Sequence, residues 1–353
     1  MYPGQATPLG TSAYATRFPE AVEQGFFRPA GSWTVSSLGL GTYLGARDEA
    51  TDQGYVEAVT TALRGGVNCI DTSLNYRNQN SELNIGTALE EQLRFGDLLR
   101  EEFVVCTKAG YMVPGAVSAG VLKPEDVVGG MHSMAPAFLA DQLERSRRNL
   151  KLETIDVFYL HNPETQLGFL TQGEFHDRVA RAFEALEEMA DHGKIAAYGM
   201  ATWQGFRTKA GASEGLSLTK LLELAAQAGG KDHRFRFIQL PFNLGMVEAF
   251  TLKRESVNGA MRTVLETAEE SGVTVVASAS LLQARLTRDM PEEIARRLPG
   301  AATDAQRALQ FTRSAPGIAV ALAGMSKAAH VAGNLGIAGF PPATREQFQH
   351  LFQ

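Results

Sequence analysis

The amino-acid sequence predicts an α/β protein: a (β/α)8 TIM barrel with an N-terminal hairpin cap and long loops at the C-terminal face of the barrel. Eight short apolar runs recur along the chain, and longer amphipathic stretches lie between them. The longest irregular segments all follow apolar runs. Alternation of strand and helix predicts a parallel sheet, and eight such units fit a closed barrel better than an open sheet.

The eight predicted strands are rich in β-branched and apolar residues and lack strict alternation of apolar and polar side chains. Strands that are buried on both faces have this composition. The predicted strands are 37–41, 67–71, 103–107, 155–160, 195–200, 235–239, 273–277 and 318–322.

Apolar residues at helical spacing mark the segments between these strands, and a glycine ends most of them. The predicted helices are 55–64, 138–150, 183–192, 218–228, 259–271 and a short helix that ends near Leu335. The order helix, glycine, strand therefore recurs along the chain.

The chain is expected to form one domain over residues 1–353, with 1–25 as an N-terminal extension and 340–353 as a C-terminal tail. A hydrophobic content of 44% is enough for a large core, and α/β barrels are often longer than an average domain. Four segments break the strand–helix rhythm and are interpreted as substrate-side loops, because each follows a predicted strand. They are 111–136, 162–175, 204–217 and 283–303.

Composition excludes several classes of partner. The net charge is −6, with 33 basic and 39 acidic residues well mixed, so no basic stripe indicates nucleic acid. Residues 1–18 lack the pattern of a signal peptide, and no apolar window is long enough for a membrane span. Cys69 and Cys106 lie in apolar runs without a C-x-x-C partner, which predicts buried thiols in a cytoplasmic protein. Histidine spacing predicts no metal site.

Four polar residues lie at or just beyond the ends of predicted strands: Asp71, Tyr76, Lys108 and His161. Taken singly, each has an ordinary explanation as a helix cap, a packing residue or a solvated side chain. Because the carboxyl ends of barrel strands meet at one face, we expect the four side chains to lie close together.

These residue types suit the reduction of a carbonyl group, which needs a hydride at carbon and a proton at oxygen. A tyrosine has a pKa near ~10 and is a poor acid or base at neutral pH, but an adjacent ammonium lowers that pKa. Asp71 would keep Lys108 charged, Lys108 would tune Tyr76, and the His161 imidazole could donate a hydrogen bond to the developing alkoxide.

Residues 65–76, Gly-Gly-Val-Asn-Cys-Ile-Asp-Thr-Ser-Leu-Asn-Tyr, resemble the strand-two motif of the aldo-keto reductase superfamily, and residues 81–89 continue it. Residues 38–43, Leu-Gly-Leu-Gly-Thr-Tyr, and 156–161, Asp-Val-Phe-Tyr-Leu-His, resemble its first-strand and fourth-strand motifs. The resemblance extends in order over roughly residues 26–335.

The resemblance implies an enzyme that reduces an aldehyde or ketone, or oxidises the alcohol, with Tyr76 as general acid or base. Lys108 and Asp71 would tune Tyr76, and His161 would orient the carbonyl. The implied cofactor contacts near the nicotinamide are Gly41, Thr42, Thr202, Gln239, Leu281 and Gly324, and the implied substrate contacts are Tyr43, Asn162 and Trp203.

The short helix near the C-terminus is expected to bind the phosphate end of the cofactor. A helix N-terminus presents free backbone N–H groups and favours anions. Ser326 and Lys327 match positions that could hold a 2′-phosphate, and His330 and Asn334 match adenine-side positions. The resemblance thus favours NADP(H), with NAD(H) as the second choice.

Two positions depart from the family pattern on the nicotinamide side. Ala201 and Thr202 stand where many members have Ser-Asn, and Ser278 stands where many stack an aromatic ring. Two other functions therefore stay open: a cofactor-binding regulatory subunit with little turnover, resembling potassium channel β subunits, and a lyase that uses Lys108 as a Schiff-base nucleophile.

Overall fold

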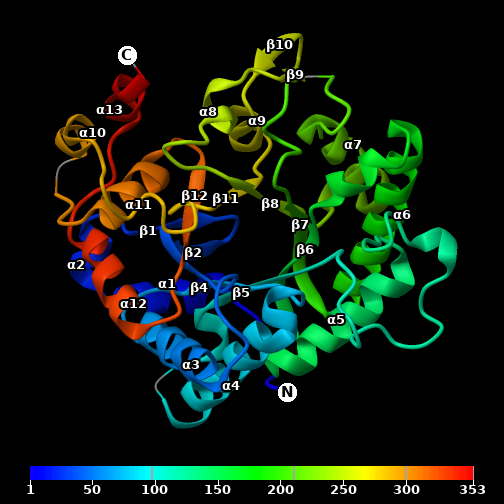
Figure 1. Ribbon diagram of the computed structural model, residues 1–353, viewed down its shortest axis with the longest axis horizontal. Helices are drawn as coiled ribbons and strands as arrows, with labels where there is room; N and C mark the ends of the chain where they lie inside the picture. The colour runs from blue at the N-terminus through cyan, green and yellow to red at the C-terminus, as the bar shows by residue number, and fades with distance from the viewer. Residues whose placement is uncertain (97, 210, 299, 353) are drawn as a thin grey trace.

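The computed structural model describes residues 1–96, 98–209, 211–298 and 300–352. Eight parallel strands close into a barrel in the order β3-β4-β5-β6-β7-β8-β11-β12, and helices surround them (Figure 1). The strands are β3 (Leu38–Gly41), β4 (Cys69–Asp71), β5 (Val104–Ala109), β6 (Ile155–His161), β7 (Ile195–Ala201), β8 (Phe235–Pro241), β11 (Thr274–Ser278) and β12 (Ile318–Gly324). All eight predicted strands and the closed barrel are confirmed.

Helices follow the barrel strands, as predicted, although the helices Asn80–Phe95 and Asp304–Ser314 match none of the predicted ranges. The longer ones are α3 (Glu49–Arg64), α4 (Asn80–Phe95), α5 (Pro136–Leu150), α6 (Gln172–Asp191), α7 (Leu218–Gly229), α9 (Val264–Glu270), α11 (Asp304–Ser314) and α12 (Ala328–Leu335). The shorter ones are α1 (Pro8–Thr16), α2 (Pro19–Glu23), α8 (Glu248–Thr251), α10 (Glu292–Arg297) and α13 (Arg345–Gln349). Within the ranges that the structure describes, no helix is both long and apolar enough to cross a membrane.

Three sequence predictions need correction. The predicted loop 283–303 contains the short helix α10 (Glu292–Arg297). The predicted helix 259–271 begins as a strand, because Ala260–Arg262 (β10) pairs with Glu255–Val257 (β9). Asn258 and Gly259 both have positive φ, the backbone of a two-residue hairpin turn, and the helix begins only at Val264. The predicted loop 162–175 ends early, because the capping box of Thr171 and Glu174 starts α6 at Gln172.

The N-terminal hairpin is confirmed. It consists of β1 (Phe27–Ala30) and β2 (Trp33–Ser36), which pair antiparallel. Trp33 stacks on Phe237 near the start of β8, with 5.7 Å between ring centroids. The hairpin therefore packs against the amino ends of the barrel strands and leaves their carboxyl ends open for a site.

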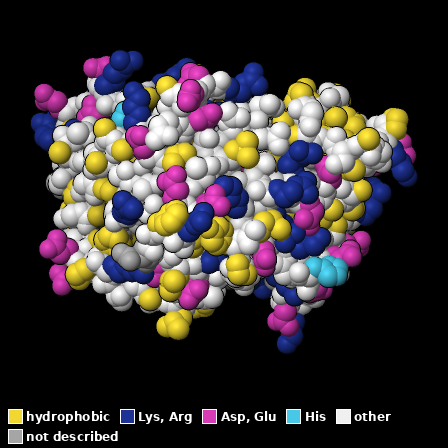
Figure 2. Space-filling view, turned by 90° about the horizontal axis from the view of Figure 1, so that it is seen from below, with side chains coloured by type: hydrophobic (Ala, Val, Ile, Leu, Met, Phe, Trp, Pro, Cys, Tyr) yellow, Lys and Arg dark blue, Asp and Glu magenta, His cyan; other side chains and the backbone are white. Residues whose placement is uncertain are grey.

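The thiols of Cys69 and Cys106 are free and buried, as predicted. On the face shown in Figure 2, Lys and Arg side chains are interspersed with Asp and Glu side chains. This mixture matches the even charge distribution of the sequence.

Candidate active site

A cavity of about 450 Å³ opens at the carboxyl ends of the barrel strands. Its walls come from strand ends and from the loops that follow them, the position at which barrel enzymes carry their sites. Predicted residues that line it are Gly41, Thr42, Tyr43, Asp71, Tyr76, His161, Asn162, Thr202, Trp203, Gln239, Leu281 and Gly324.

A buried ion pair lies at the floor of this cavity. Lys108 Nζ donates to Asp71 Oδ1 at 2.5 Å and to the Thr72 carbonyl at 2.7 Å, and the Lys108 side chain is fully buried. The same ammonium lies 4.8 Å from the centre of the Tyr76 ring. The fold thus brings three of the four predicted catalytic residues into one cluster.

Burial decides the protonation of this cluster. Burial raises the pKa of Tyr76, and the Lys108 ammonium opposes that rise only in part. The sequence predicted a net lowering, because it showed the ammonium but not the loss of hydration. Burial would lower the pKa of Lys108, but Asp71 and Tyr76 outweigh it and raise that pKa. At neutral pH the site therefore holds a charged lysine and a protonated phenol.

His161 lies edge-on to Tyr76, with 5.7 Å between ring centroids. Burial, and then the charge of Lys108, hold the pKa of His161 well below its usual range, so its imidazole is neutral. Its Nδ1 is 3.1 Å from Ser73 Oγ. The single Ser73 proton can point to Asn75 Oδ1 at 2.7 Å or to His161 Nδ1 at 3.1 Å. When it points to Nδ1, the proton of the imidazole is on Nε2 and is available to a substrate oxygen.

The cavity wall that the sequence predicted to face the nicotinamide contains one hydrogen-bonded and one unpaired polar group among the described residues. Gln239 donates from Nε2 to Asp71 Oδ2 at 2.7 Å, so it joins the Asp71 carboxylate to β8. Thr202 follows β7, and its buried hydroxyl has no hydrogen-bond partner in the described chain. Ala201 and Ser278 line the same wall without a stacking ring.

The predicted phosphate-side residues lie apart from the cavity lining. Ser326 and Lys327 directly precede α12, and no side chain caps this helix. Lys327 and His330 are exposed, whereas Asn334, one turn after His330, is buried at 7% exposure. Gly324 connects the two regions, because it lines the cavity and ends β12 with open space where a Cβ would stand.

The predicted substrate residues form the outer rim. Tyr43 and Trp203 are 55% and 40% exposed, and the Tyr43 ring packs edge-on against Tyr76 at 5.0 Å between centroids. Asn162 donates from Nδ2 to the Tyr111 hydroxyl at 3.2 Å. Large exposed aromatic rings beside a polar floor are suited to an organic substrate.

Sequence reasoning missed a clamp directly after Tyr76. Arg77, Asn78 and Gln79 have φ values of 49°, 54° and 77°, although none is glycine. A left-handed backbone costs roughly 1 kcal/mol or more for each such residue, so surrounding contacts must hold it.

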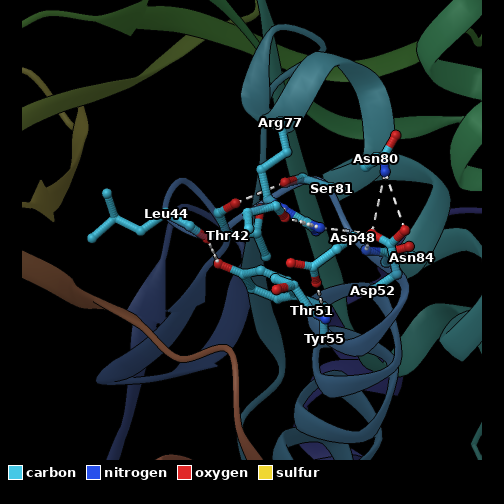
Figure 3. Close-up of polar contacts among 11 residues, drawn as sticks. Thr42, Leu44, Asp48, Thr51, Asp52, Tyr55, Arg77, Asn80, Ser81 and Asn84 are labelled. Atoms are coloured by element: carbon cyan, nitrogen blue, oxygen red, sulfur yellow. Dashed lines mark hydrogen bonds and ion pairs between the residues drawn. The ribbon is translucent and has the colours of Figure 1, made fainter.

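Arg77 makes those contacts (Figure 3). Its Nη2 donates to the Ala46 carbonyl at 2.6 Å and to Asp52 Oδ1 at 2.7 Å, and its guanidinium stacks 4.9 Å from the Tyr55 ring centre. Asp52 also accepts from Asn84 at 2.8 Å. The loop that carries Tyr43 is thereby tied to the segment that carries Tyr76.

We expect Arg77→Leu to lower the free energy of unfolding by about 2 kcal/mol, because it removes three hydrogen bonds and leaves Asp52 without its cation. Urea denaturation measures this change. The control is Arg148→Leu, which removes an exposed arginine on α5 and should stay within about 0.5 kcal/mol of the wild type. Equal losses in both variants would contradict the clamp.

Other residues at or near the site were also not singled out individually from the sequence, among them Ser73, Asn75, Tyr111, His132 and Glu164. Ser73 and Asn75 lie inside the strand-two motif beside Tyr76, so their position was a usable signal. Gln166 Nε2 donates to His132 Nδ1 at 3.0 Å, and His132 Nε2 donates to the His161 carbonyl at 2.8 Å. No local feature of the sequence predicts that contact.

Within the described ranges, no group of three or more His, Cys, Asp or Glu side chains could hold a metal ion.

Comparison with known proteins gives consistent matches. The sequence model of the Aldo/keto reductase family matches residues 37–352. The NADH-specific methylglyoxal reductase of Escherichia coli (strain K12) is 28% identical over 176 residues, 48% of each chain. Aldo-keto reductase family 4 member C11 of Arabidopsis thaliana is 26% identical over 187 residues, which is 52% of this chain and 50% of that protein. The matched region thus spans about half the length of these curated relatives.

Solved structures match over most of both chains. An aldo-keto reductase of Bacillus halodurans in its holo form gives a TM-score of 0.65 at 20% identity, covering 92% of this chain and 95% of that one. An aldo/keto reductase of Klebsiella pneumoniae in complex with NADP and acetate gives 0.61 at 20% identity, covering 91% and 92%. These structures share the barrel fold. Because the family model covers nearly the whole chain, this protein belongs to the aldo/keto reductase family, a family of NAD(P)H-dependent oxidoreductases.

Proposed function

We propose that this protein reduces an aldehyde or ketone with NADP(H), or oxidises the corresponding alcohol, and that Tyr76 is the general acid or base. One observation carries the proposal: a buried ammonium, Lys108, lies between the Asp71 carboxylate at 2.5 Å and the Tyr76 ring centre at 4.8 Å. A structural ion pair has no need of a tyrosine beside an open cavity, whereas a proton donor does.

The residues on the nicotinamide side fit the cofactor. The partnerless Thr202 hydroxyl is a suitable partner for the carboxamide, and the amide of Gln239 is close by on the neighbouring strand. Gly324 leaves open space at the end of β12, where a large planar group can approach the backbone. Gly41, Thr42 and Leu281 would complete this wall. When bound, the cofactor supplies the hydride.

The side chains of this protein would then orient the carbonyl group and transfer the proton to its oxygen. The neutral His161 imidazole orients the carbonyl by a hydrogen bond from Nε2, and Tyr76 donates its phenolic proton to the carbonyl oxygen. Lys108 favours the phenolate that remains, because its ammonium stays charged beside Asp71. In the direction of oxidation the same phenolate accepts the proton of the alcohol.

The uncapped first turn of α12 would hold the phosphate end of NADP(H), with Ser326 and Lys327 on the 2′-phosphate and His330 and Asn334 toward the adenine. We expect Lys327→Ala to raise KM for NADPH about 10-fold and to change KM for NADH less than about 2-fold, because NADH has no 2′-phosphate. Lys231→Ala, on the opposite face of the barrel, is the control. A matched rise for both cofactors would contradict the assignment.

The cluster argues against the Schiff-base alternative. A nucleophilic lysine needs a depressed pKa, and the pKa of the ion-paired Lys108 is raised. The test of the reductase is the loss of NADPH or NADH absorbance with a panel of aldehydes, ketones and sugars. Turnover of any of them supports the proposal, whereas nucleotide binding without turnover would favour the regulatory alternative.

A further inference from the structure

A groove of about 270 Å³ lies beside the active-site cavity. The two share three walls, Tyr111, Asn162 and Trp203, so the groove continues the rim of the site. A substrate that is longer than the cavity can therefore extend into it. This inference rests on the proposed function, because it treats the groove as a subsite for the distal end of a carbonyl substrate.

Glu164 is the more buried of the two carboxylates that line this groove. It follows β6 by three residues and is only 7% exposed. Its Oε1 accepts from the backbone N–H groups of Trp203 at 2.7 Å and Gln204 at 2.9 Å, which holds the loop after β7. This bonding gives Oε1 a structural role.

The other oxygen of Glu164 has no such role. Oε2 is buried and has no hydrogen-bond partner in the described chain. Burial raises the pKa of the Glu164 carboxyl, and the N–H groups of Gln204 and Trp203 oppose that rise. A buried carboxylate oxygen without a partner is costly, and a nearby cation would stabilise its negative charge whether or not that cation carries an N–H group.

The rest of the groove favours a cation. Glu214 places a second carboxylate at its edge, and no Lys or Arg lines it among the described residues. The side chains of Trp203 and Tyr111 also line it, and aromatic rings attract ammonium groups. Two carboxylates and two aromatic rings form a recognition set for a positively charged group.

We propose that this groove is a second substrate subsite, which binds an ammonium group at the end of a carbonyl compound distal to the reacting carbonyl. Glu164 and Glu214 act as specificity-determining residues and make no contact with the proton transfer at Tyr76. The enzyme would then prefer a cationic aldehyde over a neutral aldehyde of the same shape.

Binding can be measured without turnover. The chain has two tryptophans, and Trp33 is buried against Phe237, so a change in fluorescence on adding hexyltrimethylammonium reports Trp203. We expect Glu164→Gln to weaken binding about 10-fold and Glu214→Gln about 3-fold, since the first carboxylate is buried and the second exposed. Glutamine can still accept the backbone N–H groups. Glu188→Gln, near the end of α6 on the opposite face of the barrel, should change nothing.

Kinetics give the second readout. The substrates are ω-trimethylammonio-hexanal and its neutral isostere ω-tert-butyl-hexanal, compared by the ratio of their kcat/KM values. We expect this ratio to fall about 10-fold in Glu164→Gln and about 3-fold in Glu214→Gln, and to stay constant in Glu188→Gln. A ratio or an ammonium affinity that both glutamate variants leave unchanged overturns the subsite. The reductase proposal fails only if the wild type turns over no carbonyl compound of the panel, and in that case the fluorescence titration alone tests whether the groove binds an ammonium group.

Discussion

Tyr76→Phe is expected to lower kcat for carbonyl reduction by about 10³-fold while nucleotide affinity changes less than about 2-fold. The variant keeps the ring, and with it the packing against Tyr43 at 5.0 Å and His161 at 5.7 Å between centroids. Only the phenolic hydroxyl is lost. Because the transition state needs a proton at the carbonyl oxygen and the ground state does not, the loss should fall on kcat.

Tyr159→Phe is the matched control for this variant. Tyr159 lies on β6 inside the barrel, and its hydroxyl is buried without a hydrogen-bond partner in the described residues. Removing that hydroxyl should leave both stability and kcat nearly unchanged. Stopped-flow measurement of NADPH oxidation under single-turnover conditions separates the chemical step from product release. Full activity of Tyr76→Phe on any good substrate would refute the proposed proton donor.

The barrel and the cluster around Tyr76 were predictable because their signals are local. Buried parallel strands need continuous apolar runs, and strand ends of one barrel share a face, so Asp71, Lys108 and His161 could be placed together from their positions alone. The strand β10 was not predictable from periodicity, because its three residues lie within an apparent helix and depend on the turn at Asn258.

The parts of the site that escaped prediction depend on distant contacts. Gln239 reaches Asp71 across the barrel, from β8 to β4, and no spacing in the chain encodes that bond. Arg77 adopts a left-handed backbone that its residue type disfavours, and contacts with Ala46 and Asp52 support it. The pKa of Tyr76 depends on how much water the folded cavity excludes, so the sequence named its charged neighbour but not the net direction.

Lys108→Met should separate the electrostatic role of the lysine from its structural role. It leaves the buried Asp71 carboxylate without its cation, so the free energy of unfolding should fall by about 3–5 kcal/mol. It also removes the charge that lowers the pKa of Tyr76, and that pKa should rise further. A weaker acid and a less stable phenolate should slow reduction and oxidation by about 10²- to 10⁴-fold.

The double variant Lys108→Met with Asp71→Asn tests whether the two roles are distinct. The introduced amide would carry no charge and could still accept a hydrogen bond from Gln239, so most of the lost stability should return. The catalytic loss should remain, because no ammonium faces Tyr76. In the wild type, reduction should stay constant through neutral pH and fall only in strong alkali, since the raised pKa keeps the phenol protonated. The double variant should shift that fall to still higher pH. Recovery of wild-type kcat together with stability would mean that Lys108 acts on the fold alone, and that Tyr76 needs no cation to transfer its proton.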